Sequence, residues 1–258
     1  MPTQTKEKRE LAIRVTMNAT QLELLEGDIT GLDVEVIVNP ANEKLQLIGG
    51  VAGVIKRKGG PIVQEECNRI GGAATGTAVM TGAGKMRFKH IIHAVGPKMG
   101  EGDEDRKLAA AIRSCLALAD RAGLKSIAIP AISTGNFGFP MDRAARITLT
   151  EVHRYIQGGT KLQRVVVILL GDEAWNAFAR ELRRVRAQAE RLSLRTARER
   201  IIHFIETEGD DGSVVLSQSK KDWAAELGLT HEAVYRTLAR MERAGQIRIE
   251  GLVLSIRS

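Results

Sequence analysis

The alternation of apolar strands with amphipathic helices is the feature that most limits the folds open to this 258-residue chain. Residues 90–95, 126–132 and 164–170 are nearly continuous apolar runs, as expected of strands buried on both faces of a sheet. Residues 103–123 and 141–159 carry apolar side chains at helical spacing and end at glycines. Strands that alternate with helices predict an α/β sandwich. Three shorter β-rich runs precede these segments, at 11–15, 22–26 and 34–38.

The chain changes character after this region. Residues 172–200 favour a helix and are rich in arginine. The segment that follows has the pattern of short helices and two final strands. We therefore predict a first domain over residues 1–187, a basic hinge over 188–196 and a small second domain over 197–258.

The positive charge is concentrated near the predicted hinge. The chain has 38 Lys and Arg against 31 Asp and Glu, a formal net charge of +7. Eight arginines and three glutamates lie within residues 180–200, which leaves only +2 for all other residues. This segment can neutralise nucleic-acid phosphates or simply solubilise an exposed helix. Aromatic residues make up only 3%, which disfavours a recognition surface built on many stacked bases.

Several classes of protein are disfavoured by what the sequence lacks. The two cysteines, Cys67 and Cys115, cannot form a disulfide framework or a four-ligand zinc site by themselves. Together with Cys67, His90 and His93 fit no standard zinc spacing, so we predict no metal site. No apolar run approaches the roughly 20 residues that cross a bilayer, and residues 1–10 lack the core of a signal peptide. We expect a cytoplasmic protein that does not contact membranes.

Two glycine-containing loops follow predicted strands. GGVAGVIKRKGG (49–60) comes after the strand at 34–38, and STGNFGF (133–139) comes after the strand at 126–132. An open α/β sheet binds ligands at the carboxyl ends of its strands, and loop amides beside a helix N-terminus suit a diphosphate. Neither loop contains GxxxxGK[ST] or GxGxxG, which disfavours an ATPase or a Rossmann dehydrogenase. The alternative is that these glycines serve only tight turns.

The first domain resembles the macro domain family over residues 11–187. The resemblance implies a three-layer α/β/α fold with a mixed sheet, and ADP-ribose as the ligand with no cofactor required. The motifs that carry it occur in the family's order and spacing: GDIT (27–30), VIVNPAN (36–42), GGVAGVI (49–55), IIHAVGP (91–97) and IPAISTGNFGFP (129–140).

The resemblance also implies a role for individual residues. Asp28 would accept a hydrogen bond from the adenine amino group, Ile29 would contact adenine through its backbone, and Asn42 would hold the distal ribose. Phe137 would form an apolar wall for that ribose. Considered alone, Asp28 can instead be a helix N-cap or an Asx turn, and Asn42 a turn residue. The first phosphate loop would be Gly50, Val51, Ala52 and Gly53, and the second Ser133, Thr134, Gly135, Asn136, Phe137 and Gly138.

Two positions depart from the family pattern. Members that efficiently hydrolyse ADP-ribosyl esters have an aspartate where this chain has Ala52, so no general base can act from that position. Asn42 is then the one candidate catalytic residue, through its hold on the distal ribose. Family members often carry an aromatic residue after the last strand, where this chain has Leu170 and Gly171.

The second domain has the pattern of a helix-turn-helix followed by a β-hairpin. Gly228 separates two predicted helices, and Gly245 ends the second of them. Ser217 or Ser219 can cap the first helix, and Thr230 can cap the second. The region 195–256 resembles the winged-helix domain of the cyclic-AMP receptor protein family.

That resemblance implies that the second helix reads double-stranded DNA. Glu232 and Arg236 would contact bases, a cytosine amino group and a guanine edge respectively. Thr230, His231 and Tyr235 complete the predicted DNA-binding set. The alternative is a protein-interaction domain in which Glu232 and Arg236 form a solvated pair.

Helix-turn-helix proteins usually bind DNA as dimers, so a homodimer is possible. An apolar stripe on the helix from Asp172 can form a short dimer seam, or it can pack on the sheet instead. The stripe consists of Leu182, Val185, Ala189 and Leu192.

Three hypotheses follow from the two domains. The first is an ADP-ribose-binding domain coupled to a DNA-binding domain, in a ligand-responsive transcriptional regulator or a DNA-associated ADP-ribose reader. The alternative is a hydrolase that removes ADP-ribose from a target, or a phosphatase acting on ADP-ribose 1″-phosphate. The third is an interaction protein in which neither site is occupied.

Overall fold

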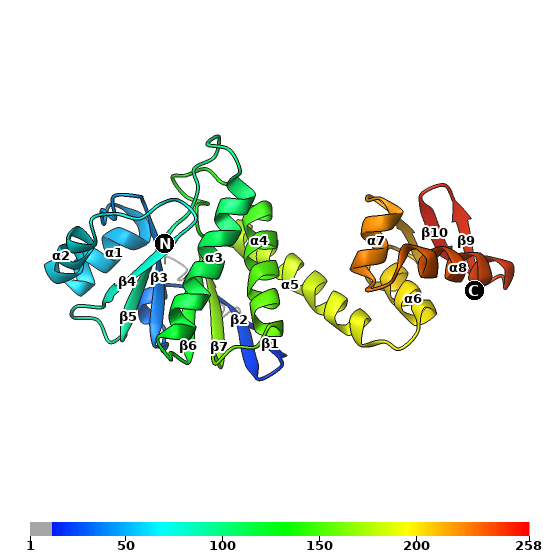
Figure 1. Ribbon diagram of the computed structural model, residues 1–258, viewed down its shortest axis with the longest axis horizontal. Coiled ribbons are helices and arrows are strands. Elements are labelled where there is room, and N and C mark those ends of the chain that lie inside the picture. The colour runs from blue at the N-terminus through cyan, green and yellow to red at the C-terminus, as the bar shows by residue number, and fades with distance from the viewer. Residues whose placement is uncertain (1–11, 258) are drawn as a thin grey trace, which may run out of the picture. The chain divides into compact units, whose positions relative to one another are not determined.

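A computed structural model of the protein describes residues 12–257 (Figure 1). The chain divides into two compact units, the first ending at Glu181 and the second beginning at Leu182. Both belong to the predicted classes, an α/β domain and a winged helix-turn-helix. No helix within residues 12–257 combines the length and hydropathy of a membrane span.

The first unit is built on a mixed sheet, as predicted, and this sheet has seven strands. Its five inner strands run parallel, and the two outer strands, β1 and β4, pair antiparallel with their neighbours. Near-continuous apolar runs form the inner strands because both of their faces are covered. The order across the sheet is β1 (Ala12–Met17), β2 (Thr20–Glu26), β7 (Arg164–Leu169), β6 (Ser126–Pro130), β3 (Val36–Ala41), β5 (His90–Val95) and β4 (Ala78–Gly82).

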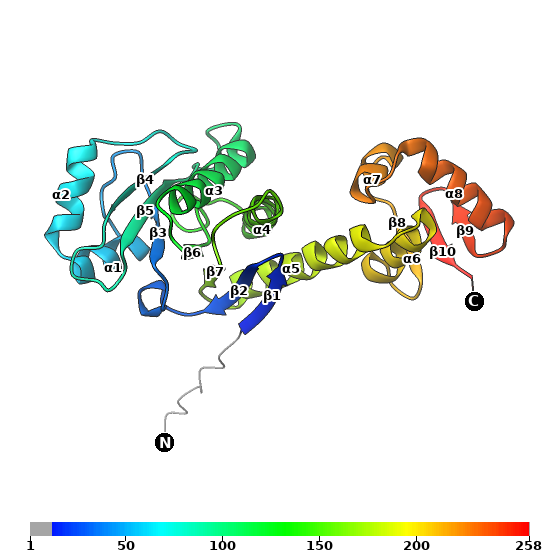
Figure 2. The same ribbon diagram turned by 60° about the horizontal axis from the view of Figure 1, so that its bottom comes forward.

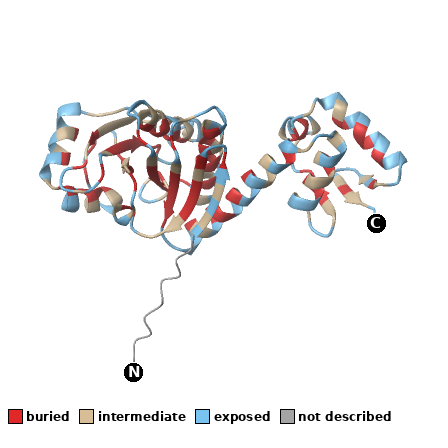
Figure 3. Cartoon of the chain, turned by 90° about the horizontal axis from the view of Figure 1, so that it is seen from below, coloured by how far each residue is buried: buried red, intermediate tan, exposed pale blue. Residues whose placement is uncertain are grey.

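Helices cover both faces of this sheet, which gives the predicted three layers (Figures 1 and 2). The helices α3 (Glu104–Arg121) and α4 (Met141–Gln157) pack against each other on one face. On the other face, α1 (Gly50–Gly59) buries Ile55 against Ile37 and Ile91 of the sheet. Figure 3 shows buried residues concentrated in the strands and exposed residues on the outer helix surfaces. The remaining helical elements are η1 (Ile29–Gly31), α2 (Pro61–Ile70) and α5 (Asp172–Ser193).

The second unit is a three-helix domain with a small antiparallel sheet, in the order β8-β10-β9. Trp223 lies at its centre, fully buried, with its ring 5.4 Å from that of Phe204. Ser219 caps the first helix of the helix-turn-helix and Thr230 caps the second, as predicted. The elements are α6 (Ala197–Glu208), β8 (Ser213–Val215), α7 (Lys220–Glu226), α8 (His231–Arg243), β9 (Ile247–Glu250) and β10 (Val253–Ile256).

The stripe considered as a dimer seam is only partly exposed. Leu182 and Val185 are buried within the chain, Ala189 is half-buried and Leu192 is exposed. Residues 188–193 of the predicted hinge are helical, since α5 continues to Ser193. The buried half of the stripe has no apolar surface to offer a second copy.

Candidate functional site

The residues predicted to hold the ligand lie at the same edge of the sheet. Asp28 follows β2, Asn42 follows β3 and Ser133 follows β6. These strands belong to the parallel part of the sheet, so their carboxyl ends lie at the same edge. The helix α1, which begins with Gly50, packs against both β3 and η1 at this edge.

Asp28 caps η1 and forms an ion pair. Its Oδ1 atom accepts hydrogen bonds from the Thr30 amide at 2.9 Å and the Thr30 hydroxyl at 2.7 Å. Its Oδ2 atom lies 3.1 Å from Nζ of Lys58 in the last turn of α1. Burial acts to raise the pKa of Asp28, but the hydrogen bonds from Thr30 and Lys58 outweigh it and hold the pKa below its ordinary value. The N-cap role and a role in ligand binding are compatible, because each carboxylate oxygen can accept more than one hydrogen bond.

Asn42 organises the turn that follows β3. Its Oδ1 atom accepts from the amides of Lys44 and Gln46, both at 3.1 Å, and its Nδ2 donates to the Gln46 carbonyl at 3.0 Å. The turn-forming role considered for this residue is therefore present. The side chain is half-buried and lies at the same sheet edge as the glycine loops.

The first predicted phosphate loop opens directly into α1. Gly49 and Gly50 have φ values of 64° and 47°, which other residues rarely adopt. The Gly53 amide donates to the Gly49 carbonyl at 2.7 Å, so Gly50, Val51 and Ala52 supply the first amides of the helix. Such amides have no partner within their own helix and favour anions. Ala52 itself is buried and provides no carboxylate.

The second predicted loop is strained at its first residue. Ser133 has a φ of 68°, and its buried Oγ atom has no hydrogen-bond partner within the described part of the chain. The hydroxyl lies so close to Gly96 that a Cβ at that position would clash with it. A strained residue with an unpaired buried hydroxyl is typical of a functional loop.

The rest of this loop is held by backbone hydrogen bonds. The Phe139 amide donates to the Ser133 carbonyl at 3.1 Å, and the Gly138 amide donates to the Gly135 carbonyl at 2.9 Å. Met99, after β5, donates its amide to the Phe137 carbonyl at 2.9 Å. Phe137 is half-buried, with the Lys98 ammonium 5.4 Å from its ring centre. Thr134 is half-buried, and Gly135, Asn136 and Gly138 are exposed.

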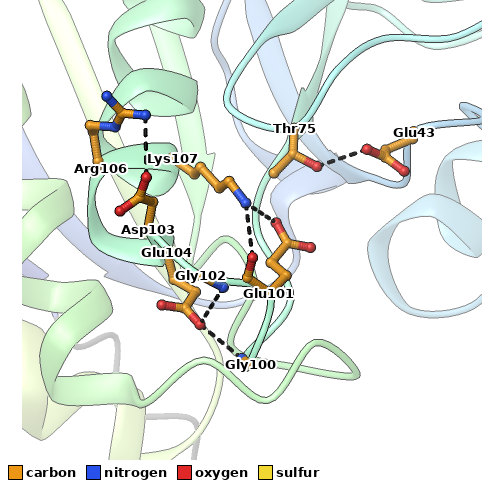
Figure 4. Close-up of polar contacts among 9 residues, drawn as sticks. All are labelled: Glu43, Thr75, Gly100, Glu101, Gly102, Asp103, Glu104, Arg106 and Lys107. Atoms are coloured by element: carbon orange, nitrogen blue, oxygen red, sulfur yellow. Dashed lines mark hydrogen bonds and ion pairs between the residues drawn. The ribbon is translucent and has the colours of Figure 1, made fainter.

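A polar network surrounds the segments that follow β3 and β5 (Figure 4). Thr75 donates to the Glu43 carboxylate at 3.0 Å, next to Asn42. Lys107 at the start of α3 lies 3.3 Å from Glu101. Glu104 accepts hydrogen bonds from the amides of Gly100 and Gly102. The hydrogen bond from its own backbone amide, together with these two, lowers the pKa of Glu104. The contacts of Glu101 and Glu104 fix the loop between β5 and α3.

A buried polar cluster lies between strands and was not expected from the sequence. His93 of β5 is fully buried beside Asn39 of β3, Thr81 of β4 and Cys67 of α2. Burial lowers the pKa of His93 to about 4. Within residues 12–257, no three His, Cys, Asp or Glu side chains are grouped as a metal ion requires. Leu170, which follows β7, is 83% exposed.

The helix α8 presents the predicted DNA-binding residues on one outer face. Thr230 is its N-cap, and His231, Glu232, Tyr235 and Arg236 are all exposed on the first turns. The opposite face buries Val234, Thr237, Leu238 and Met241.

The ring of Tyr235 has two neighbours on the exposed surface of α8. The His231 ring lies edge-on at 4.5 Å, and the Lys220 ammonium lies 5.0 Å from the ring centre. Glu232 and Arg236 are both exposed on this surface.

One buried arginine of the second unit escaped the sequence analysis. Arg191 of α5 is completely buried, with Nη2 3.0 Å from both Thr207 and Glu208. Its Nη1 lies 3.7 Å from Glu226, and its guanidinium lies 4.6 Å from the centre of the Phe204 ring. Arg191 therefore fixes the last turns of α5 to α6 and α7.

Comparison with known proteins supports the assignment of both units. A macro domain-containing protein of Caldanaerobacter subterraneus is 43% identical over 166 residues, which cover 62% of this chain and 94% of that protein. The chain belongs to the macro domain family. The macro domain family model matches residues 38–148, and the Crp-like helix-turn-helix domain model matches residues 199–257. Both resemblances predicted from the sequence are confirmed.

Two further relatives bear on the macro domain. The O-acetyl-ADP-ribose deacetylase 1 of Pantoea vagans is 40% identical over 168 residues, covering 63% of this chain and 98% of that protein. A variant of the Oceanobacillus iheyensis macrodomain solved with ADPR is 29% identical, with a TM-score of 0.66. It matches 68% of this chain and 98% of its own. The macro domain fold of this chain is thus nearly complete relative to these proteins.

Proposed function

We propose that the macro domain binds ADP-ribose at the edge of the sheet described above. The observation that carries the proposal is the convergence of Asp28, Asn42 and the two loops at the carboxyl ends of parallel strands. Asp28 supplies an acceptor at the adenine end. The amides of Gly50 to Ala52 and the Ser133–Gly138 loop suit the diphosphate. The related Oceanobacillus iheyensis macrodomain solved with ADPR supports the choice of ligand.

We further propose that the Crp-like domain binds double-stranded DNA through α8. Glu232 and Arg236 stand on the exposed face in the first turns, where a helix-turn-helix contacts base edges. The whole protein is then a ligand-responsive transcriptional regulator or a DNA-associated reader of ADP-ribose. Occupancy of the macro domain alters DNA affinity if ADP-ribose contacts two states of the chain differently.

A hydrolase is the second candidate. The similarity to an O-acetyl-ADP-ribose deacetylase favours it, and in this proposal Asn42 would position the distal ribose. Against it, Ala52 removes the carboxylate that would serve as a general base at that position. The reader function is therefore preferred.

Two assays separate the reader from the hydrolase. The first is calorimetric titration with ADP-ribose, and the second is incubation with ADP-ribosylated protein, O-acetyl-ADP-ribose and ADP-ribose 1″-phosphate. Binding without turnover supports the reader. Turnover that Asn42→Ala abolishes supports the hydrolase. No heat of binding would exclude both.

Selection from random DNA tests the second unit. We expect enrichment of a symmetric sequence, with Arg236→Ala relaxing the preference at one base in each half-site. Arg121→Ala, which removes an exposed charge from α3 of the macro domain, serves as the control. Repeating the binding assay with saturating ADP-ribose measures the coupling, and an unchanged DNA affinity would contradict regulation by the ligand.

A further inference from the structure

Lys58 forms an ion pair with Asp28, the carboxylate that we propose accepts a hydrogen bond from adenine. Its Nζ atom lies 3.1 Å from Oδ2 of Asp28 and 2.5 Å from the hydroxyl oxygen of Thr30. The Lys58 and Asp28 side chains are 50% and 55% exposed, so a ligand can reach both. The end of α1 therefore brings a donor to the same point where η1 offers an acceptor.

We propose that Lys58 widens the base specificity of this site, so that it accepts 6-oxo purine nucleoside diphosphates as well as adenine nucleotides. This inference rests on the proposed binding of ADP-ribose, with adenine at Asp28. A carboxylate alone offers only acceptors, whereas a carboxylate beside an ammonium offers both an acceptor and a donor. The pair can consequently match either of two hydrogen-bonding patterns at position 6 of a purine.

The two patterns differ by a single exchange of donor and acceptor. Adenine carries an amino group at position 6, which donates to Asp28 while Lys58 stays on Asp28 and Thr30. Hypoxanthine and guanine carry a carbonyl oxygen at position 6 and a hydrogen on N1. In this case N1–H donates to Asp28, and the flexible Lys58 side chain turns its ammonium to the O6 atom.

Without Lys58 the same site would reject a 6-oxo purine. N1–H could still donate to Asp28, but the O6 atom would then lie beside the carboxylate, acceptor against acceptor, with no donor from the protein. Sites that leave a polar group of the ligand unpaired discriminate strongly against it. An exposed ion pair with no ligand role would contribute little and would not change the preference for one base over another.

The experiment compares ADP with inosine 5′-diphosphate, which differs from ADP in the substituent at position 6 and the hydrogen on N1. Calorimetric titration of the full chain should give dissociation constants for the two within about tenfold of each other. In Lys58→Met the preference for ADP should increase by at least about tenfold. Lys58→Arg, which keeps a donor, should stay near the native ratio. Lys56→Met, which removes another exposed lysine of α1, is the matched control.

Two results would overturn the proposal while leaving ADP-ribose binding intact. One is a native preference for ADP above about a hundredfold, and the other is the same preference in the native chain and in Lys58→Met. A native chain that binds neither ADP-ribose nor ADP would overturn the proposed function and this inference with it. Thermal unfolding of each variant confirms that the exposed substitution leaves the macro domain folded.

Discussion

Asn39 and His93 are paired residues of two neighbouring parallel strands, and Nδ2 of Asn39 lies 3.1 Å from Nδ1 of His93. The amide nitrogen can only donate, so Nδ1 must accept. On the other side of the ring, Nε2 lies 2.8 Å from Oγ1 of Thr81, whose own hydrogen is directed to the Gly82 carbonyl. The network therefore selects the neutral imidazole with its proton on Nε2.

The neutral state of His93 makes the stability of the macro domain depend on pH. Burial lowers the pKa of His93 to about 4, against about 6.5 in an unfolded chain. As the pH falls from about 6.5 towards 4, the unfolded chain takes up a proton that the folded chain does not, and stability is lost by up to ~3 kcal/mol. Calorimetry between pH 7 and 4.5 should show this loss. The loss of stability should be absent in His93→Gln and retained in His90→Gln. An equal loss in the native chain and in both variants would refute this account of His93.

The two thiols should be inert in the folded protein. Burial raises the pKa of Cys67 to about 11 and also raises that of Cys115, and both side chains are fully buried. Cys67 lies 3.7 Å from Nε2 of His93, yet that ring is held neutral and cannot stabilise a thiolate. We expect no reaction with a disulfide reagent at pH 8, and two thiols per chain after unfolding in urea. Rapid labelling of Cys67 in the native protein would show instead that it is an activated nucleophile.

The sequence predicts those parts of the fold that depend on local pattern. The inner strands are visible as apolar runs, and the strand predicted at 90–95 matches β5 (His90–Val95) in full. Thr230 and Gly228 mark the helix-turn-helix because a cap and a left-handed turn require those residue types. The convergence of Asp28, Asn42 and Ser133 follows from parallel strands and is equally predictable.

Features that depend on distant partners were not predictable. The edge strand β4 and the three-residue β8 carry no long apolar run, because an edge strand is not covered on every side. Arg191 belongs to an arginine-rich helix and has the sequence pattern of a solvated residue. Its burial is decided by Glu208 and Glu226, which lie 17 and 35 positions further along the chain. The contact of Lys58 with Asp28 likewise depends on the placement of α1 against η1.

Replacement of Arg191 should destabilise the second unit. Arg191→Ala removes the cation beside Glu208 and Glu226, of which Glu226 is only 12% exposed. Glu226 keeps a second cation, since Nη2 of Arg184 lies 3.8 Å from it, and Glu208 is partly exposed. We therefore expect a cost below the roughly 3–5 kcal/mol of a fully broken buried ion pair. Calorimetric unfolding of the full chain should show a lower transition temperature for the second unit and an unchanged transition temperature for the macro domain. Arg195→Ala, an exposed arginine four residues later, should leave both transitions in place.

Ser133 offers a test in which stability and ligand binding change in opposite directions. Its φ of 68° is strained for a residue with a Cβ, and its buried hydroxyl lacks a partner in the described structure. Ser133→Gly removes both costs, so we expect the macro domain to gain about 1 kcal/mol in its free energy of unfolding. The same change removes the hydroxyl and the fixed backbone of the proposed phosphate loop, so the affinity for ADP-ribose should fall several-fold. Urea unfolding and calorimetric titration measure the two effects.

Ser133→Ala is the matched comparison, since it keeps the backbone strain and loses only the hydroxyl. If Ser133→Gly both stabilised the domain and bound ADP-ribose as the native chain does, neither the hydroxyl nor the strain at Ser133 would have a role in holding the diphosphate.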